Sequence, residues 1–207
     1  MVIPFGALSR LEAAFSPGRK NLESSAAVRF SSNLGEYDLS IMAGEFQKDR
    51  VIGGDFAGSI GGAGLRGEFA YTWNDRGANF FRAILNADYS FANDYYAFIE
   101  FYFNGQGTTR KEKYPLFIAD LLSGRIFNFA KHYAAASVIK SVTPLLGLNI
   151  YGLFNLNDRS SLIGPALTYS LATNLEISTS VYFFNGASDS EFGLQKNSYF
   201  AYLQYYF

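Results

Sequence analysis

The closing stretch of the chain, 197-NSYFAYLQYYF-207, alternates in a way that predicts an unusual kind of strand. In an extended strand successive side chains point to opposite faces, so every second residue shares a face. One face of this stretch carries Tyr, Ala, Leu, Tyr and Phe, and the other carries Phe200, Tyr202, Gln204 and Tyr206. Chain ends of soluble proteins usually fray into water. A strand with lipid on one side and a lumen on the other is expected to have this composition.

The overall composition agrees with such strands. Aromatic residues make up 18% of the chain, with 15 Tyr, 21 Phe and 20 Gly, a mixture that favours strands with tight turns and aromatic belts. The 17 basic and 18 acidic residues nearly cancel, so a nucleic-acid partner is not expected. No stretch approaches the roughly 20 apolar residues of a membrane-spanning helix, so a membrane protein of this sequence would have to be a barrel.

Period-two alternation runs through the whole chain in segments of about ten residues, as in barrel strands. The segment 63–73 places Leu65, Phe69 and Tyr71 on one face and Arg66 and Glu68 on the other. The pattern predicts an all-β, antiparallel up-and-down transmembrane β-barrel of about twelve strands, in one domain over residues 1–207. The predicted strands lie near 5–16, 24–32, 37–47, 50–60, 63–73, 79–90, 94–104, 131–142, 145–156, 161–171, 174–185 and 197–207.

The connections between these segments are predicted to be short on one side and long and polar on the other, an asymmetry of outer-membrane barrels. The short ones read NLGE, GG, FAND, TPL and ATN; the others read SPGRKN, QKD, NDRGAN, the stretch 105–130, NDRSS and NGASDSEFGLQK. The stretch 105–130 breaks the alternation and has apolar residues at helical spacing, so a short helix is possible there. It is expected either to pack over the rim or to fold inward and narrow the lumen.

The closing strand resembles the C-terminal signature of bacterial outer-membrane β-barrel proteins, a porin-like superfamily. Its positions are matched by Tyr199, Ala201, Leu203, Tyr205 and Phe207. The resemblance implies integral insertion in the outer membrane, contact with its lipid, and recognition of the last strand by the barrel-assembly machinery. The first fifteen residues have no signal-peptide pattern, so the chain is expected either to have lost one or to be a C-terminal fragment of a longer barrel.

Charges on the faces opposite the apolar sets are predicted to line the lumen. They are Arg10, Glu12, Arg29, Asp38, Asp55, Arg66, Glu68, Arg82, Asp88, Glu100, Lys140 and Glu176. Because unpaired charges cannot be buried dry, they must be solvated or paired. A water-filled lumen would make a passive channel for ions or small hydrophilic solutes. A lumen closed by ion pairs would make a non-conducting structural or surface-interaction barrel. Tyrosines that face the lumen could also provide a surface along which sugars pass, which is a further alternative.

Other functions find less support in the sequence. With no Cys, thiolate chemistry and Cys-ligated metal sites are excluded, and no loop has calcium-binding spacing, so neither a metal nor another cofactor is expected. A lipid hydrolase would need a serine beside His132, the single histidine; Ser137 lies on the opposite face of the same strand, which leaves Ser170 or Ser178 as partners. No enzymatic activity is expected. A soluble sheet protein would have to expose large apolar patches.

Overall fold

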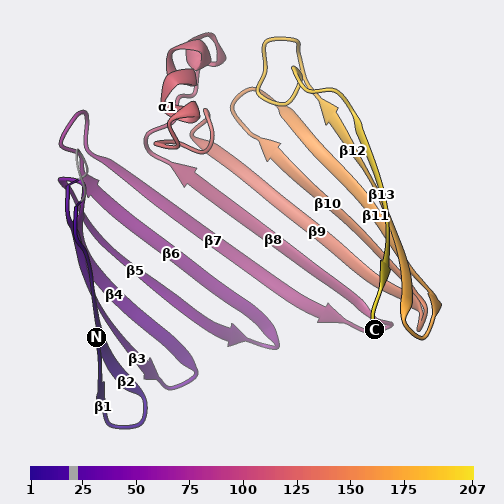
Figure 1. The fold of residues 1–207 in the computed structure, drawn as a ribbon, viewed down its shortest axis with the longest axis horizontal. Coiled ribbons are helices and arrows are strands. Elements are labelled where there is room, and N and C mark those ends of the chain that lie inside the picture. The colour runs from indigo at the N-terminus through magenta and orange to yellow at the C-terminus, as the bar shows by residue number, and fades with distance from the viewer. Residues whose placement is uncertain (19–22) are drawn as a thin grey trace. The chain divides into compact units, whose positions relative to one another are not determined.

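The computed structural model describes residues 1–18 and 23–207 and shows an all-β fold (Figure 1). Thirteen strands form one sheet in which each strand neighbours the next in the chain, so the predicted antiparallel up-and-down class is confirmed. The strands are β1 (Val2–Phe5), β2 (Ser9–Ser16), β3 (Ser25–Leu34), β4 (Tyr37–Phe46), β5 (Asp49–Ile60), β6 (Ala63–Trp73), β7 (Phe80–Phe91), β8 (Tyr95–Asn104), β9 (His132–Thr143), β10 (Leu146–Asn155), β11 (Ser160–Ala172), β12 (Leu175–Asn185) and β13 (Ser198–Tyr205).

The chain divides into two compact units, which are described separately below. Unit 1 comprises residues 1–86 and 103–106, and unit 2 comprises residues 87–102 and 107–207. Unit 1 therefore contains β1 to β6 and most of β7, and unit 2 contains β9 to β13 and most of β8.

The first predicted strand, near 5–16, is in fact a hairpin, which is why the sheet has thirteen strands instead of about twelve. The chain reverses through residues 6–8, with Gly6 at φ 68°, a left-handed conformation that glycine adopts without a Cβ clash. Strand β1 then pairs with β2 in antiparallel register, Val2 opposite Glu12. The N-terminal ammonium of Met1 donates a hydrogen bond to the Ala13 carbonyl oxygen at 2.7 Å.

Short and long connections alternate as expected, with one exception. The connections at 6–8, 35–36, 61–62, 92–94, 144–145 and 173–174 have two or three residues. On the opposite ends of the strands the segments 74–79, 105–131 and 186–197 are longer, but Gln47 and Lys48 alone join β4 to β5. Both have positive φ, 52° and 81°, as a tight hairpin turn requires. The predicted SPGRKN loop lies partly outside the described residues.

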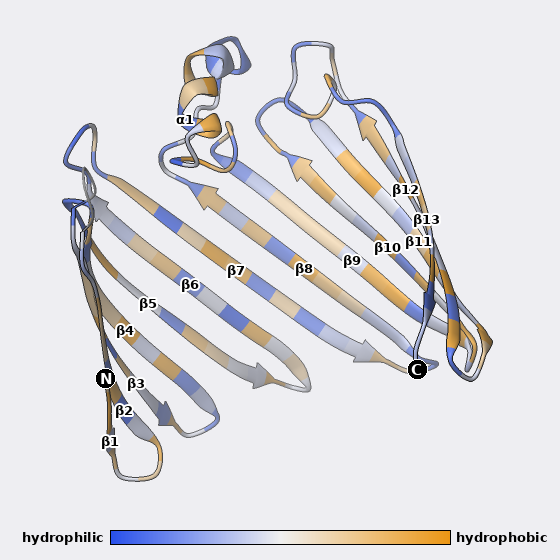
Figure 2. Ribbon diagram, in the orientation of Figure 1, coloured by the Kyte–Doolittle hydropathy of each residue, from blue (hydrophilic) through white to orange (hydrophobic). Residues whose placement is uncertain are grey.

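Each unit has one polar and one apolar sheet face. In unit 1 the register places Arg29 opposite Met42, and on the other face Phe30 opposite Ile41. In unit 2 it places Ser137 opposite Tyr151, and on the other face Val138 opposite Ile150. We call the faces of Arg29 and Ser137 the polar faces, and those of Phe30 and Val138 the apolar faces. Figure 2 shows the resulting alternation of hydrophilic and hydrophobic residues along the strands.

The long segment between β8 and β9 contains the helical structure that its spacing suggested. A 3₁₀ helix, η1 (Lys111–Phe117), leads into a one-turn helix, α1 (Ile118–Leu122). Tyr114 of η1 is buried with Ala130 and Tyr133, and Phe129 packs against this cluster. Within the described residues, no helix is long and apolar enough to cross a membrane.

Candidate functional site

The polar face of unit 1 gathers charged residues from five neighbouring strands. Cross-strand register puts Arg10, Ser31, Ser40, Asp55 and Glu68 in one row. Side chains directly opposite one another in an antiparallel pair have Cβ atoms about 5 Å apart, so members of a row interact. Asp55 therefore has a second carboxylate on one side and a hydroxyl on the other.

Arg29 is the centre of this charged face. Its Nη2 donates to both carboxylate oxygens of Asp55, at 3.2 and 3.0 Å, and its Nε donates to Ser40 Oγ at 3.0 Å. Ser40 Oγ in turn donates to Asp55. The Glu12 carboxylate lies 4.0 Å from Arg29 Nη1 and 3.4 Å from Arg10 Nε. Opposite charges thus alternate across β2, β3 and β5, and Arg29 and Asp55, both predicted to line the lumen, are in direct contact.

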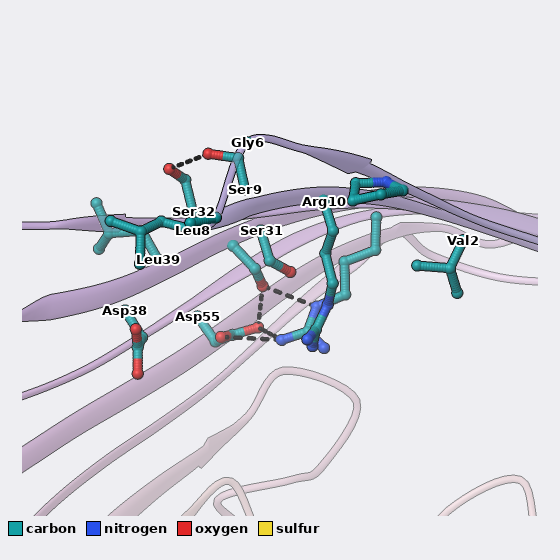
Figure 3. A pocket seen from close by; sticks show the side chains of 14 residues that line it. Val2, Gly6, Leu8, Ser9, Arg10, Ser31, Ser32, Asp38, Leu39 and Asp55 are labelled. Atoms are coloured by element: carbon teal, nitrogen blue, oxygen red, sulfur yellow. Dashed lines mark hydrogen bonds and ion pairs between the residues drawn. The ribbon is translucent and has the colours of Figure 1, made fainter.

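These side chains line a hollow of about 490 Å³ on the polar face (Figure 3). In Figure 3 dashed lines mark the contacts of Asp55, and none leads to Asp38. Asp38 accepts a hydrogen bond from Asn33 Nδ2 at 3.0 Å, beside it in the register. The side chains of Arg29 and Asp55 keep 43% and 38% of their surface exposed, so the ion pair remains in contact with water.

The other predicted polar residues of unit 1 lie farther along the same face. Arg66 stands opposite Ala57, which is opposite Asp38, and Glu68 stands opposite Asp55. The Arg82 guanidinium lies 4.7 Å from the centre of the Phe80 ring and donates to the side-chain oxygen of Gln106. The predicted charges of unit 1 therefore spread over the face, and direct contact is made at the Arg29 cluster.

The polar face of unit 2 is built differently. Over β9 to β13, all of which the structure describes, its polar residues are mostly Ser, Asn and Tyr, and Glu176, opposite Ser170, supplies the single charge. Asp88 on β7 and Glu100 on β8 are half-buried. Tyr151 and Tyr182 meet edge to face at 5.9 Å, and Phe200 adds a third ring 5.0 Å from Tyr182.

The prediction that Lys140 belongs to the polar set is wrong. The register pairs Lys140 with Leu148, which pairs with Leu167, so Lys140 lies on the apolar face of unit 2. Its ammonium donates to the Asn93 carbonyl oxygen at 2.7 Å and lies 3.8 Å from the centre of the Tyr95 ring. Because Lys140 is near the end of β9, its long stem covers apolar surface while its charge reaches the turn.

The apolar faces are exposed in both units. On unit 1, Ile41 is 54% and Phe69 is 49% exposed; on unit 2, Ile150 is 56% and Leu203 is 62% exposed. These residues sit near the middle of their strands, where no loop covers them. A soluble protein rarely leaves contiguous apolar surface of this kind in water.

Tyrosines mark one border of the apolar faces. They lie at the strand ends next to the two- and three-residue turns: Tyr37 in unit 1, and Tyr89, Tyr95, Tyr169 and Tyr205 in unit 2. At the opposite ends of the strands the apolar face of unit 1 carries Tyr71 and Trp73, whose rings meet at 4.9 Å, and Phe81. Tyr and Trp, with an apolar ring and a polar group, prefer the border between hydrocarbon and water.

Sequence reasoning missed a polar cluster in unit 2, centred on Glu191 of the β12–β13 loop. Glu191 Oε2 accepts hydrogen bonds from the Tyr133 hydroxyl at 2.5 Å and from Asn155 Nδ2 at 2.7 Å. Its Oε1 accepts from the Phe129 backbone amide at 3.1 Å. Asn155 Nδ2 also donates to the Tyr114 hydroxyl oxygen at 3.0 Å. Three parts of the chain therefore meet at one carboxylate, namely residues 129–133, Asn155 and the loop itself, and Tyr114 joins them through Asn155.

Two further contacts hold the same loop. The Glu191 backbone amide donates to Asp158 Oδ2 at 2.8 Å, in the β10–β11 turn. The Lys111 ammonium lies 2.7 Å from Asp189 Oδ1, joining η1 to the loop. We call the assembly of η1, the 156–159 turn and the 186–197 loop the cap; it covers the loop-side end of the unit 2 polar face, where Tyr133 and Asn155 are buried. The 105–130 insertion therefore packs on that face.

Burial raises the pKa of the Glu191 carboxyl above its ordinary value, and the negative charge of Asp158 acts in the same direction. The hydrogen bonds from Tyr133, Phe129 and Asn155 act against this rise because they favour the charged form. The pKa of Asp189 is lowered by its hydrogen bond with Lys111. Burial also raises the pKa of the Tyr114 hydroxyl.

The histidine that a hydrolase would use lies on the wrong face for the serines considered. His132 is on the apolar face, with its ring 6.3 Å from that of Phe101 and its Nδ1 3.1 Å from Asn157 Nδ2. Ser137, Ser170 and Ser178 stand on the polar face, opposite Tyr151, Glu176 and Tyr202. The dyads proposed from sequence are therefore not assembled.

The closing strand is an ordinary member of the sheet. In β13, Tyr199, Ala201, Leu203 and Tyr205 stand opposite Val181, Thr179, Ile177 and Leu175 on the apolar face of unit 2. Phe207 follows the strand and is fully exposed.

Comparison with known proteins finds structural likeness alone. No protein-family description matches the chain, and no curated protein sequence matches it. Among solved structures, the NanC porin is similar at 12% identity and a TM-score of 0.41, covering 97% of this chain and 100% of the porin. BamA from Haemophilus ducreyi lacking POTRA domains 1–3 is similar at 12% identity and a TM-score of 0.45, covering 90% of this chain and 42% of that protein.

Proposed function

We propose that residues 1–207 form a single β-barrel domain that is integral to the bacterial outer membrane and conducts ions or small hydrophilic solutes passively. The observation that carries the proposal is the contrast between the two faces of the sheet. One face exposes aliphatic residues behind a border of tyrosines, and the other carries partly hydrated ion pairs.

The apolar faces support a lipid environment on energetic grounds. Burying an aliphatic side chain is worth about 1.5–3 kcal/mol, and here residues such as Ile41, Ile150 and Leu203 obtain no such burial from the protein. Lipid tails supply it without a protein partner. The 13 residues of β11 span about 40 Å at 3.3 Å per residue. At the tilt of about 40° that barrel strands have, β11 would rise about 30 Å, enough to cross the apolar band of an outer-membrane barrel, about 25 Å tall.

The polar face of unit 1 supports conduction. Neighbouring strands bring charges of both signs close together, at Arg10, Glu12, Arg29 and Asp55. The side chains of these residues remain partly exposed to solvent. In a dry interior such exposed charges would pay a large desolvation penalty. Channel water satisfies them, and the mixture of signs favours small solutes over strong selection for one ion charge. The pattern of β13 is consistent with recognition by the barrel-assembly machinery, which we include in the proposal.

Conductance of the refolded chain in a planar lipid bilayer tests this function. Heat-modifiable gel migration first establishes that the inserted chain is folded. Current steps that scale with salt concentration are expected from a water-filled bore. A folded, inserted protein that gives no steps above the lipid background contradicts conduction.

A non-conducting structural or surface-interaction barrel is the second candidate, and the cap favours it. The cap closes the loop-side end of the unit 2 polar face, where its residues Tyr114 and Glu191 contact Asn155 and cover Tyr133. The same bilayer experiment separates the two candidates, because a plugged barrel is folded and silent. We expect no enzymatic activity from either.

A further inference from the structure

The β12–β13 loop, residues 186–197, is held to unit 2 chiefly by polar contacts. The carboxylate of Glu191 receives three of them, from Tyr133, Asn155 and the Phe129 amide. The Glu191 amide and the Lys111–Asp189 ion pair add two more. Phe192 is half-buried, whereas Leu194, the loop's other large apolar residue, is 71% exposed. The loop thus brings little apolar surface to its docking site.

The predominance of polar contacts over apolar packing distinguishes the loop from a permanent plug. Apolar packing is spread over many contacts, whereas three of this loop's docking contacts converge on the Glu191 carboxylate, so that removing this one group removes three hydrogen bonds at once. The partners themselves are fixed, because Tyr133 and Asn155 are buried residues of β9 and β10. Tyr133 is further held by a hydrogen bond of 2.7 Å from the Ala130 amide. Buried partners therefore face a loop that is anchored mainly through polar groups.

We propose that residues 186–197 are a latch, with Glu191 as the residue that fastens it, and that its release uncovers the loop-side end of the unit 2 polar face. The effect on conduction rests on the proposed channel function, whereas fastening of the loop does not. In the fastened state the loop lies over Tyr133 and Asn155; in the released state these residues face water.

Limited trypsin digestion of the protein folded in lipid vesicles measures fastening without any reference to conduction. Lys196 lies in the loop, and Arg76 in the β6–β7 connection gives an internal reference site. The variants are Glu191→Ala and Tyr133→Phe. Matched controls are Glu176→Ala and Tyr151→Phe, which remove the same groups from the same face outside the cap. Cleavage after Lys196, relative to Arg76, is expected to rise about tenfold in the two latch variants, as for a loss near 1.4 kcal/mol, and to stay unchanged in the controls.

The Lys111–Asp189 ion pair provides a second test that does not alter the Glu191 contacts. Lys111→Glu alone and Asp189→Lys alone are expected to raise cleavage after Lys196, and the double exchange is expected to restore the original rate. Cleavage rates that stay at the unsubstituted value in Glu191→Ala, or in both single exchanges, overturn the latch.

Bilayer conductance of the same variants separates the two proposals. Larger or longer openings in Glu191→Ala than in Glu176→Ala support the latch as a gate. Faster cleavage in a protein that never conducts supports the latch and contradicts the channel. Normal conductance with unchanged cleavage and unchanged openings contradicts the latch and supports the channel.

Discussion

The hydroxyl of Tyr133, on β9, donates a 2.5 Å hydrogen bond to Glu191, 58 positions later in the chain. This contact joins the buried end of a strand to a loop that is otherwise largely exposed. It makes the protonation of Glu191 relevant to the position of the loop.

Docking of the 186–197 loop is expected to weaken as pH rises. The pKa of Glu191 is raised in the docked state, mainly by burial, so the docked loop holds its proton more tightly than a released loop does. Docking is therefore strongest below the ordinary Glu pKa and is progressively lost as pH rises through the raised value. Of the other groups near the loop, Asp158 adds to the rise, while the Lys111–Asp189 pair lowers the pKa of Asp189 and is lost only in strong acid.

A spin label measures this pH dependence. The chain has no cysteine, so Leu194→Cys gives a single labelling site in the exposed part of the loop. Label mobility in vesicles is expected to increase between acid and neutral pH. In a labelled protein that also carries Glu191→Gln, this change of mobility with pH should vanish. A change of the same size in that double variant would show that another group titrates.

Substitutions at the Arg29 cluster are expected to change ion selectivity more than stability. Arg29→Gln removes one positive charge from the polar face and is expected to shift reversal potentials toward cation preference, and Asp55→Asn toward anion preference. The stability cost of breaking this partly exposed pair is at most about 1 kcal/mol. Lys140→Gln is the matched control, because Lys140 lies on the apolar face. An equal shift from Lys140→Gln would contradict this assignment of faces.

A side chain added at Gly67 is expected to destabilise unit 1. The Phe56 ring of the neighbouring strand lies over this glycine, so that a Cβ at Gly67 would fall 2.2 Å from Phe56 Cε1. Gly67→Val should cost about 1–3 kcal/mol, as overpacking does, measured by urea unfolding in vesicles. Gly147→Val is the control, because nothing lies within 4 Å of a Cβ there. Equal losses at the two positions would rule out the Phe56 contact as the cause.

The single tryptophan, Trp73, reports membrane contact directly. It lies at the end of β6 on the apolar face and is 46% exposed. Brominated lipids are expected to quench its fluorescence, and bromine near the headgroups should quench more than bromine deep in the chains. The comparison variant combines Trp73→Phe with Ile41→Trp, which moves the probe to the middle of the apolar face and should reverse the order. Fluorescence insensitive to brominated lipid in both proteins would exclude the lipid-facing assignment.

Much of the fold was predictable because a strand in a two-faced sheet repeats every two residues, so that Leu65, Phe69 and Tyr71 reveal β6 without any partner. The first hairpin was missed because the alternation around Gly6 continues through a turn. The sequence prediction placed Lys140 on the polar face because the residue is charged. Lys140 lies two positions after Val138 in the same strand, however, so both side chains point to the apolar face.

The Glu191 cluster could not be predicted for a different reason. Glu191 lies in a loop, where no periodicity constrains its direction, and its partners come from β9, β10 and the segment before β9. The approach of Phe56 to Gly67 was equally hidden, since it depends on the register between β5 and β6. A sequence shows that glycines and aromatics are frequent, but pairing decides which of them meet.

The position of Glu191 in the chain also bears on the order of folding. Its partners lie on β9 and β10, and the loop that carries it is positioned by β12 and β13. The cap therefore cannot close until those strands have paired, and contacts between such distant segments form slowly. A chain that stalls before its last hairpin forms would leave Tyr133 and Asn155 exposed to water. The time at which these two residues become protected from solvent would therefore report when unit 2 is complete.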